Sequence, residues 1–352
     1  MKVSIKTIVF LGLTILLSAC AHLDKDLTYT PPDFEPVSHE FYLDKDIEWA
    51  VVKDIKLKMD IYVPDTGDRP HPVLVIYHGG GWLMNSKSIM NDLSAYIASH
   101  SDFIVCNADY RLLADSKNTT TMNEIIEDAM GSLIWVNENI ERWNGDPDRI
   151  AITGDSAGGH LASMVLLGSD MLREERFSGT NPGFKPTYIP NGYTLERCME
   201  EKLLEVQAAV ISYGAFDIKK LAENTLETQY NIFWRLGGVN PRGIFLGPIN
   251  VKNSPQYYEA VSPAYNIPDG EYRKLPPQLF LAGSRDTTVP PDTVMEYVNL
   301  MSEAGQDVLY WEHKGRPHAF LDSGTNMFLG ISFKKDGIPA ADVMIAYLNQ
   351  VM

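Results

Sequence analysis

Short apolar runs recur along the chain at intervals that predict alternating strands and helices. Residues 56–63 (KLKMDIYV) alternate apolar and polar side chains, as a half-exposed strand does. Residues 73–77 (VLVIY) are apolar without a break, which indicates a strand buried on both faces. Further strands are predicted over residues 103–106, 150–153, 208–212, 279–282 and 308–311.

Apolar residues at helical spacing occupy the intervals between these strands. In residues 123–140, Ile126, Met130, Leu133 and Ile134 fall on one helical face. Strand, crossover helix and parallel strand form a βαβ unit, so the pattern predicts an α/β fold with a doubly wound, mostly parallel sheet and flanking helices. The other predicted helices are 157–172, 294–304 and 340–351.

Two long segments, 173–205 and 219–274, interrupt this alternation. Both are rich in Gly, Pro, Asn and aromatic residues, and such long irregular connections in a compact domain are usually functional. We expect both to be insertions that cover one end of the sheet as a cap. The aromatic side chains of Trp234, Tyr257 and Tyr258 suit either sugar stacking or the core of the cap itself.

The first residues of the chain have the pattern of an export signal. Lys2 and Lys6 make a basic start, and residues 8–19 carry no charge. This stretch is too short for a membrane span and suits the apolar region of a signal peptide. It ends in Leu-Ser-Ala before Cys20, which resembles a bacterial lipobox, although an ordinary signal peptide with an incidental cysteine is the alternative.

These observations divide the chain into a signal peptide (1–19), a lipid-anchored stalk (20–36) and a folded domain (37–352). Cys20 is then the lipid attachment site. Acyl chains on a protein supply about 0.8 kcal/mol of membrane affinity per buried methylene, so this anchor needs no amphipathic protein surface. We expect an exported bacterial lipoprotein of the cell envelope, facing the periplasm or on the outer membrane surface. The membrane leaflet stays open.

Charge and composition exclude several other functions. The chain has 30 Lys and Arg against 46 Asp and Glu, a formal charge of −16, which repels nucleic-acid phosphates and anionic lipids. We therefore expect no nucleic-acid partner, and membrane contact through the lipid anchor only. Three cysteines make no disulfide framework, and whether Cys106 and Cys198 pair is open. The histidines lack metal-site spacing, so neither a metal nor a cofactor is implied.

Residues 154–159 (GDSAGG) lie between a predicted strand and a predicted helix. They contain G-x-S-x-G, the sequence of a nucleophile elbow, in which a serine sits on a sharp turn. Small neighbours are needed because the backbone on the two sides of the serine nearly collides. A glycine-rich phosphate loop is the alternative, but it requires a lysine that does not follow here. The motif predicts Ser156 as a nucleophile.

Residues 78–82 (HGGGW) directly follow the buried strand at 73–77. Three successive glycines expose backbone N–H groups with no side chain in the way. Together with the N–H of Ala157, these groups can hold the oxyanion of a tetrahedral intermediate. His78 comes too early to be the base of the serine and is expected to brace the loop. We expect Trp82 to line a substrate pocket.

A nucleophilic serine needs a base, and the base needs an orienting acid. In this fold, the acid and then the histidine follow the serine along the chain. Asp286 lies in a loop directly after the strand predicted at 279–282, and His318 lies after the strand predicted at 308–311. Asp292 and His313 are the competing candidates.

Taken together, these motifs resemble the hormone-sensitive-lipase-like esterases of the α/β-hydrolase superfamily, and also the neighbouring carbohydrate esterases that include acetyl and feruloyl esterases. The resemblance runs from about residue 56 to the C-terminus and includes residues 109–112 (DYRL). Leu-Ala-Asp at 113–115 departs from the Ala-Pro-Glu common in the lipase-like members. The stretch before residue 56 lacks their paired cap helices, and both departures favour the carbohydrate-esterase side.

The resemblance implies a role for each matching residue. Ser156 is the nucleophile, His318 the base and Asp286 the orienting acid. The oxyanion donors are Gly80, Gly81 and Ala157, and the structural residues under the site are Asp109 and Arg111.

We therefore expect a serine carboxylic-ester hydrolase that forms an acyl-enzyme, acting on small acyl esters that include acetyl or feruloyl groups on sugars. The same three side chains also cleave amides, so an amidase, an arylformamidase or a peptidase is the second hypothesis. A non-catalytic binding protein on a hydrolase scaffold is the third. Relatives of that kind usually lose the serine or the histidine, and this chain keeps both. The partner is then a small-molecule or carbohydrate ester, and the oligomeric state is open.

Overall fold

One mostly parallel sheet of eight strands runs through the centre of the computed structural model, which describes residues 25–352. The strand order is β1-β2-β4-β3-β5-β6-β7-β8, with β1, β2 and β4 paired antiparallel and the other neighbours parallel. The strands are β1 (Phe41–Val52), β2 (Ile55–Pro64), β3 (His71–Tyr77), β4 (Ile104–Ala108), β5 (Gly145–Asp155), β6 (Ala208–Ser212), β7 (Gln278–Gly283) and β8 (Val308–His313). This order confirms the doubly wound α/β fold that the sequence predicts.

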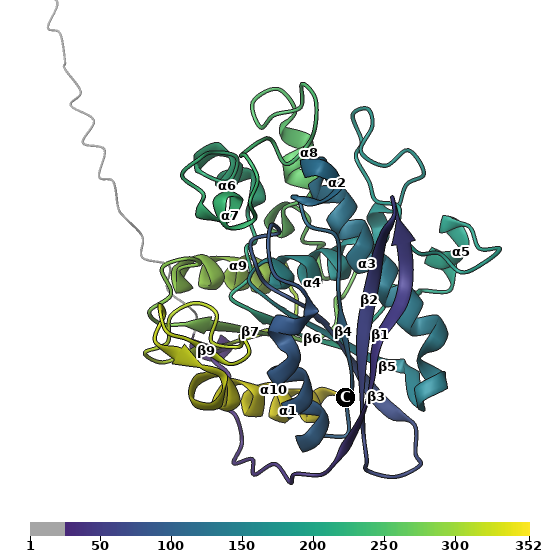
Figure 1. Ribbon diagram of the computed structural model, residues 1–352, viewed down its shortest axis with the longest axis vertical. Helices are drawn as coiled ribbons and strands as arrows, with labels where there is room; N and C mark the ends of the chain where they lie inside the picture. Colours follow the sequence, from purple (N-terminus) through teal and green to yellow (C-terminus); the bar gives the residue numbers. More distant parts are fainter. Residues whose placement is uncertain (1–24) are drawn as a thin grey trace, which may run out of the picture.

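Helices cover both faces of the sheet (Figure 1). Val73, Val75 and Tyr77 of β3 join the apolar cluster under α3 (Met122–Asn139), α4 (Ala157–Leu167) and α9 (Pro291–Glu303). Leu74 and Ile76 join the cluster under α1 (Asn91–His100) and α10 (Ile338–Val351). Successive side chains of β3 enter opposite cores, and both cores are apolar. This explains why the apolar run of β3 is unbroken.

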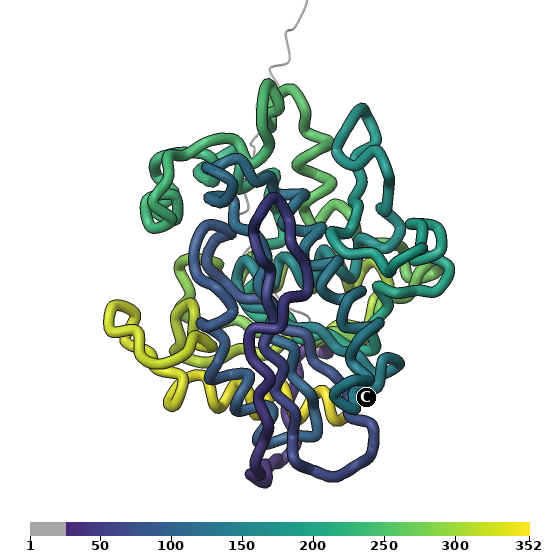
Figure 2. The backbone as a smooth tube through the Cα atoms, turned by 45° about the vertical axis from the view of Figure 1, so that its right-hand side comes forward, coloured from purple at the N-terminus to yellow at the C-terminus, as the bar shows by residue number. Residues whose placement is uncertain are grey.

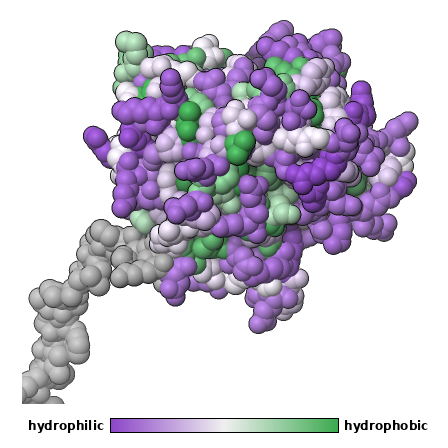
Figure 3. All heavy atoms as spheres, turned by 90° about the horizontal axis from the view of Figure 1, so that it is seen from below, coloured by the Kyte–Doolittle hydropathy of each residue, from purple (hydrophilic) through white to green (hydrophobic). Residues whose placement is uncertain are grey.

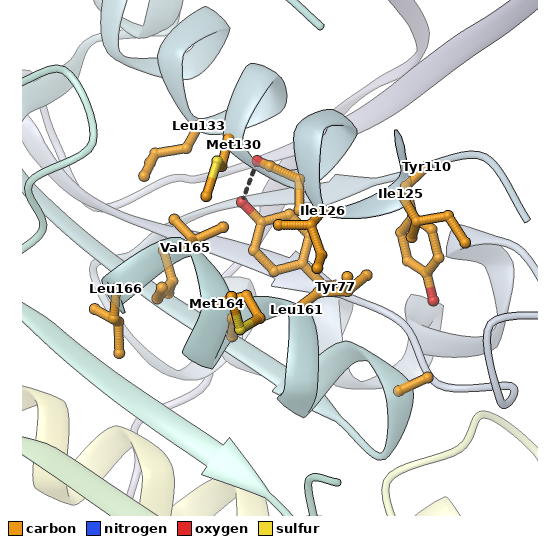
Figure 4. Close-up of a cluster of buried hydrophobic side chains, with 14 of the residues drawn as sticks. Tyr77, Tyr110, Ile125, Ile126, Met130, Leu133, Leu161, Met164, Val165 and Leu166 are labelled. Carbon is orange, nitrogen blue, oxygen red and sulfur yellow. Dashed lines mark hydrogen bonds between the residues drawn. The ribbon is translucent and has the colours of Figure 1, made fainter. Parts of the chain in front are cut away.

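The larger core forms where α3 and α4 pack on the sheet (Figure 4). Met130 and Leu133 of α3 and Val165 of α4 are fully buried around Tyr77. The Tyr77 hydroxyl donates a 2.9 Å hydrogen bond to the carbonyl of Ala129, so its polar end is satisfied inside this core. These contacts fix α4, the helix that follows Ser156.

The second of the two insertions supplies most of the cover over the end of the sheet that carries the functional residues. Residues 219–274 contain α7 (Ile232–Leu236) and α8 (Pro255–Ala260), next to α6 (Ile218–Asn224), at the top of Figure 1. Residues 173–205 instead run along α3 and contain α5 (Leu195–Glu200): the amide of Lys185 donates to Glu127, and the Tyr188 hydroxyl to Glu138. The start of the first insertion also contacts the cap: Phe177 packs on Phe245 and Tyr257, and the Tyr257 hydroxyl donates to the carbonyl of Gly179 at 3.0 Å. For the rest of residues 173–205, a place in the cap stays a prediction. The remaining short elements are η1 (Lys25–Leu27), η2 (Lys87–Met90), α2 (Asp115–Asn118), η3 (Ile140–Trp143), η4 (Gly168–Met171), η5 (Pro263–Tyr265), β9 (Thr325–Asn326), β10 (Ile331–Ser332) and η6 (Phe333–Gly337).

The first described residues lie against the domain, although they fall in the segment predicted to be a stalk. Thr28 bridges to Tyr310 of β8, and the Tyr29 amide donates to the Tyr310 carbonyl at 2.7 Å. The Tyr29 side chain is buried, and its hydroxyl donates to Gln350 at 3.0 Å. The predicted signal peptide and Cys20 lie outside the described residues.

Cys106 and Cys198 are both buried and free, so they do not pair with each other. From residue 25 onward, no helix has the length and apolar character that crossing a membrane requires. Polar residues cover most of the face seen from below, as the acidic composition leads one to expect (Figure 3).

Candidate active site

Ser156 occupies the tight turn between β5 and α4. Its backbone angles are φ 53° and ψ −117°, a region that non-glycine residues rarely adopt. A Cβ atom on Gly154 would stand 2.2 Å from the carbonyl oxygen of Gly158, and one on Gly158 would stand 1.9 Å from that of Tyr77. The flanking glycines of the motif are thus required by the close approach of the backbone around the serine.

His318 and Asp286 meet at this serine. The Nε2 atom of His318 lies 2.9 Å from Ser156 Oγ, and its Nδ1 atom lies 2.6 Å from Asp286 Oδ2. The other carboxylate oxygen of Asp286 accepts hydrogen bonds from the amides of Thr288 and Val289, at 2.8 and 2.9 Å. All three side chains are buried and form one continuous relay of hydrogen bonds.

The competing candidates lie elsewhere. Asp292 is exposed in the first turn of α9. His313 ends β8 and directs its Nε2 atom at the carbonyl of Asp336, 2.8 Å away. Sequence order alone left both possible, and the geometry joins neither to Ser156.

Gly81 and Ala157 line the same cavity as Ser156, and Gly80 precedes them in the glycine loop. Ala157 opens α4, so its N–H has no partner within the helix. Gly80 and Gly81 take positive φ angles of 128° and 59°, and their amides donate to no other group in residues 25–352. Unpaired donors beside a serine hydroxyl are the arrangement that stabilises an oxyanion.

The glycine loop is held by Asp155, a residue whose role the sequence did not reveal. Its Oδ1 atom accepts a 2.6 Å hydrogen bond from the amide of Gly79. The pKa of Asp155 is raised well above its usual range, mainly by burial and secondly by the charge of Asp322. In the sequence, Asp155 is marked only by its place next to Ser156 in the motif, and this place does not predict a contact with the glycine loop at 78–82.

Two further residues beside His318 escaped the sequence reading. The ring of Tyr213 contacts the imidazole edge-on with 4.8 Å between centroids. Burial raises the pKa of Asp322 to about 6, and the charge of His318 acts on it in the opposite direction. Neither residue lies in a recognisable motif. Tyr213 directly follows β6, and the position of that strand in the sheet places it beside His318.

A cavity of about 370 Å³ opens beside Ser156. Its walls come from Trp82, from the cap helices α6 and α7, and from α9. Phe216 and Tyr297 stack in parallel at 4.0 Å on one side, while Lys220 and Glu296 add charged groups to the lining. The site therefore presents a largely apolar, partly aromatic surface next to the serine.

Trp82 is fixed by a buried histidine of α4. Its indole N–H donates to Nδ1 of His160 at 3.1 Å, and Nε2 of His160 lies 2.8 Å from the carbonyl of Val261. These partners require His160 to be neutral with its proton on Nε2. Burial lowers the pKa of His160 to about 4, in agreement with that assignment.

The remaining predicted residues have supporting positions. His78 stacks on Tyr110 at 4.3 Å and donates to the carbonyl of Gly79, so it braces the loop. Asp109 accepts from the amide of Lys87, and the buried Arg111 pairs with Asp128 at 2.7 Å. No cluster of three or more potential metal ligands occurs within residues 25–352.

Comparison with known proteins places this chain in a family. Residues 59–300 match the family BD-FAE. The chain belongs to the BD-FAE family. Among curated relatives, it is 24% identical over 82% of its length to an isoprenylcysteine alpha-carbonyl methylesterase of Arabidopsis thaliana, and 30% identical over 71% to the probable carboxylic ester hydrolase LipM of Mycobacterium tuberculosis. The matches span 60% and 49% of those two relatives.

Solved structures agree on the fold of this BD-FAE member. The apo form of Thermogutta terrifontis esterase 2 superposes with a TM-score of 0.60 at 22% identity, covering 90% of this chain and 97% of that one. The same esterase phosphorylated by paraoxon gives a TM-score of 0.57 at 21% identity, covering 85% and 91%. The chain thus has the α/β-hydrolase fold of these esterases.

Proposed function

We propose that the chain hydrolyses carboxylic esters, with Ser156 as nucleophile, His318 as general base and Asp286 as the group that orients the base. The observation that carries this proposal is the relay from Ser156 Oγ through His318 to Asp286, with distances of 2.9 and 2.6 Å. The family and the names of the curated relatives point to the same reaction class.

In the first half of the reaction, Ser156 Oγ attacks the carbonyl carbon of the ester while His318 Nε2 removes the hydroxyl proton. The carbonyl oxygen becomes an anion and is held by the amides of Gly80, Gly81 and Ala157. His318 then gives its proton to the departing alcohol oxygen. The C–O bond breaks and the acyl group stays on Ser156.

In the second half, a water molecule takes the place of the alcohol. His318 removes a proton from the water, whose oxygen attacks the acyl carbon, and the same amides hold the new oxyanion. His318 returns the proton to Ser156 Oγ as the carboxylic acid leaves. Asp286 keeps the imidazole in the tautomer with its proton on Nδ1 throughout.

The test is kinetic. Ser156→Ala should lower kcat on a short-chain p-nitrophenyl ester by a factor of about 10⁴ to 10⁶ without changing the far-ultraviolet circular dichroism. Ser163→Ala is the matched control, because Ser163 lies further along α4 and bonds only to the carbonyl of Gly159. Retention of more than about a tenth of the rate by Ser156→Ala would sink the serine mechanism.

For the substrate, we propose esters with a small or aromatic acyl group, acetyl or feruloyl, carried on a sugar. The aromatic walls of the cavity, Phe216 and Tyr297 above all, suit a planar acyl group, and Lys220, Asn224 and Glu296 offer polar contacts. A panel of p-nitrophenyl acetate, longer p-nitrophenyl esters, methyl ferulate and acetylated xylan separates the possibilities. Preference for long aliphatic acyl chains over all of these would contradict the assignment.

For location, we propose a lipoprotein of the bacterial envelope, anchored through Cys20. The support is the lipobox-like sequence before Cys20 and the short apolar stretch at 8–19. Full-length protein expressed in a bacterium should incorporate labelled fatty acid and sediment with membranes. Cys20→Ser should abolish the label, and persistent labelling of that variant would place the lipid elsewhere.

A further inference from the structure

A small hairpin carries three consecutive apolar residues that are exposed in the described part of the chain. β9 and β10 pair antiparallel, Asn326 with Ile331 and Thr325 with Ser332. Met327 and Phe328, at the tip, are 86% and 102% exposed, and Leu329 is 41% exposed. Isolated exposed apolar residues are ordinary on protein surfaces, but a run of three at a tip indicates a contact surface.

The hairpin is ordered by its own hydrogen bonds. The amides of Phe328 and Leu329 both donate to the Asn326 side chain, at 3.1 and 3.2 Å, and the Phe333 amide donates to the Gly324 carbonyl at 2.9 Å. Figure 2 shows this yellow segment standing out from the side of the molecule. The tip is therefore presented to the outside with its backbone already arranged.

Two lysines follow this hairpin on an otherwise acidic chain, while Asp92 accepts a 2.8 Å hydrogen bond from the amide of Gly324 at its base. Lys334 and Lys335 lie in η6, the short helix after β10, and are exposed, and neither forms an ion pair within residues 25–352. The nearby Asp336 is buried and is paired with Arg316 at 2.5 Å. An apolar, aromatic tip flanked by lysines matches the boundary between acyl chains and anionic headgroups.

We propose that the β9–β10 hairpin inserts Met327, Phe328 and Leu329 into the surface of an anionic lipid bilayer, with Lys334 and Lys335 at the headgroups. This goes beyond ester hydrolysis and rests on the proposed anchoring at Cys20. It also replaces the expectation that membrane contact is made by the lipid alone.

The point where the chain enters the fold makes this contact geometrically feasible. Lys25 is only five positions after Cys20, and an extended chain spans at most about 3.6 Å per residue, or about 18 Å in all. Tyr29 is held at the last turns of α10, through Gln350 and Tyr347. The hairpin lies just before the other end of α10, a helix of 14 residues and so about 21 Å long. A lipid on Cys20 thus keeps the domain close to the bilayer. The hairpin and the start of the described chain lie near the two ends of α10, so both can face the same bilayer.

The experiment uses the full chain reconstituted in liposomes that contain phosphatidylglycerol. The variant Phe328→Cys is labelled with an environment-sensitive dye; Cys106 and Cys198 are buried and do not compete. The matched control is Tyr272→Cys, because Tyr272 is 91% exposed but follows the acidic residues Asp269 and Glu271 and lies outside the hairpin. We expect the dye at 328 to shift to shorter wavelength and to lose most of its emission to nitroxide-labelled lipids, and the dye at 272 to do neither.

Charge reversal supplies a second measurement. Lys334→Glu with Lys335→Glu should weaken the quenching at 328, as should replacement of phosphatidylglycerol by phosphatidylcholine. No quenching at 328, or equal quenching at both positions, would overturn the proposal. A wavelength shift that grows with protein concentration in the absence of lipid would indicate a second copy of the chain on the hairpin and would overturn it as well.

Hydrolysis of a soluble ester is measured in the same preparation. Since the hairpin residues line no part of the cavity beside Ser156, all the variants should keep the wild-type rate. Lost quenching with intact hydrolysis refutes the membrane contact alone. Absent hydrolysis in the wild type refutes the proposed function instead.

Discussion

At the scale of single residues, the surroundings of two aspartates separate their roles. Asp286 is buried, accepts two amide hydrogen bonds and contacts His318. Asp292 lies six positions further along and is exposed on α9. A carboxylate fixed in this way holds the imidazole in one tautomer, and an exposed one far from the ring does not.

Asp286→Asn should therefore lower kcat/KM by a factor on the order of 10⁴, because an amide favours the wrong tautomer of His318. Asp292→Asn should leave kcat/KM nearly unchanged. Steady-state kinetics on one p-nitrophenyl ester measures both. The opposite ranking of the two variants would require a different acid.

At the scale of elements, the sequence predicts the parts of the sheet that are built from unbroken apolar runs. It does not predict β1, which carries several charges and pairs only with β2 at the edge of the sheet. Register shifts between Asp44 and Ile47 and between Glu48 and Ala50 interrupt its alternation, so the period of a strand is lost. Irregular pairing of this kind is settled by the neighbouring strand.

The residues of the candidate site also fall into a group that the sequence predicts and a group that it does not. Ser156, the glycine loop, Asp286 and His318 lie in loops after predicted strands, so their positions follow from the order of the strands. Asp322 and Tyr213 reach the site through tertiary packing, 166 and 57 positions after Ser156, and no local pattern marks them. The walls of the cavity are likewise set by how the cap helices pack.

The elbow itself supplies a prediction about an element. Gly158→Ala would place a Cβ atom 1.9 Å from the backbone oxygen of Tyr77, so the turn between β5 and α4 must open. We expect a loss of about 1–3 kcal/mol in the free energy of unfolding and a large fall in kcat. Gly168→Ala is the control, because the nearest atom to its added Cβ is the methyl end of the Met130 side chain, which can change rotamer, rather than backbone. Chemical denaturation and kinetics of both variants give the answer, and equal effects would show that clearance at the elbow is unimportant.

At the scale of the whole molecule, buried ionisable groups make stability depend on pH. Burial lowers the pKa of His78 and of His160 to about 4, against about 6.5 in an unfolded chain. Between these values the unfolded state binds protons that the folded state does not, so stability falls as the pH drops. Glu127 acts in the opposite direction, since burial raises its pKa to about 7.

His160→Gln isolates one of these contributions. The difference in unfolding free energy between wild type and variant should shrink by on the order of 1–2 kcal/mol from pH 7 to pH 5, because only the wild type has this histidine to protonate on unfolding. Chemical denaturation at the two pH values measures it. A constant difference would mean that His160 is not held neutral by the fold.

The central claim, that Ser156 is the nucleophile of an ester hydrolase, is tested most directly by covalent labelling. Paraoxon should transfer its diethyl phosphoryl group to Ser156 Oγ with release of p-nitrophenolate, the serine proton passing to His318. We predict one phosphoryl group per chain by intact mass, its location on the peptide that contains Ser156, and loss of ester hydrolysis in proportion to labelling. Labelling on any other residue, or full activity in a fully labelled protein, would contradict the account.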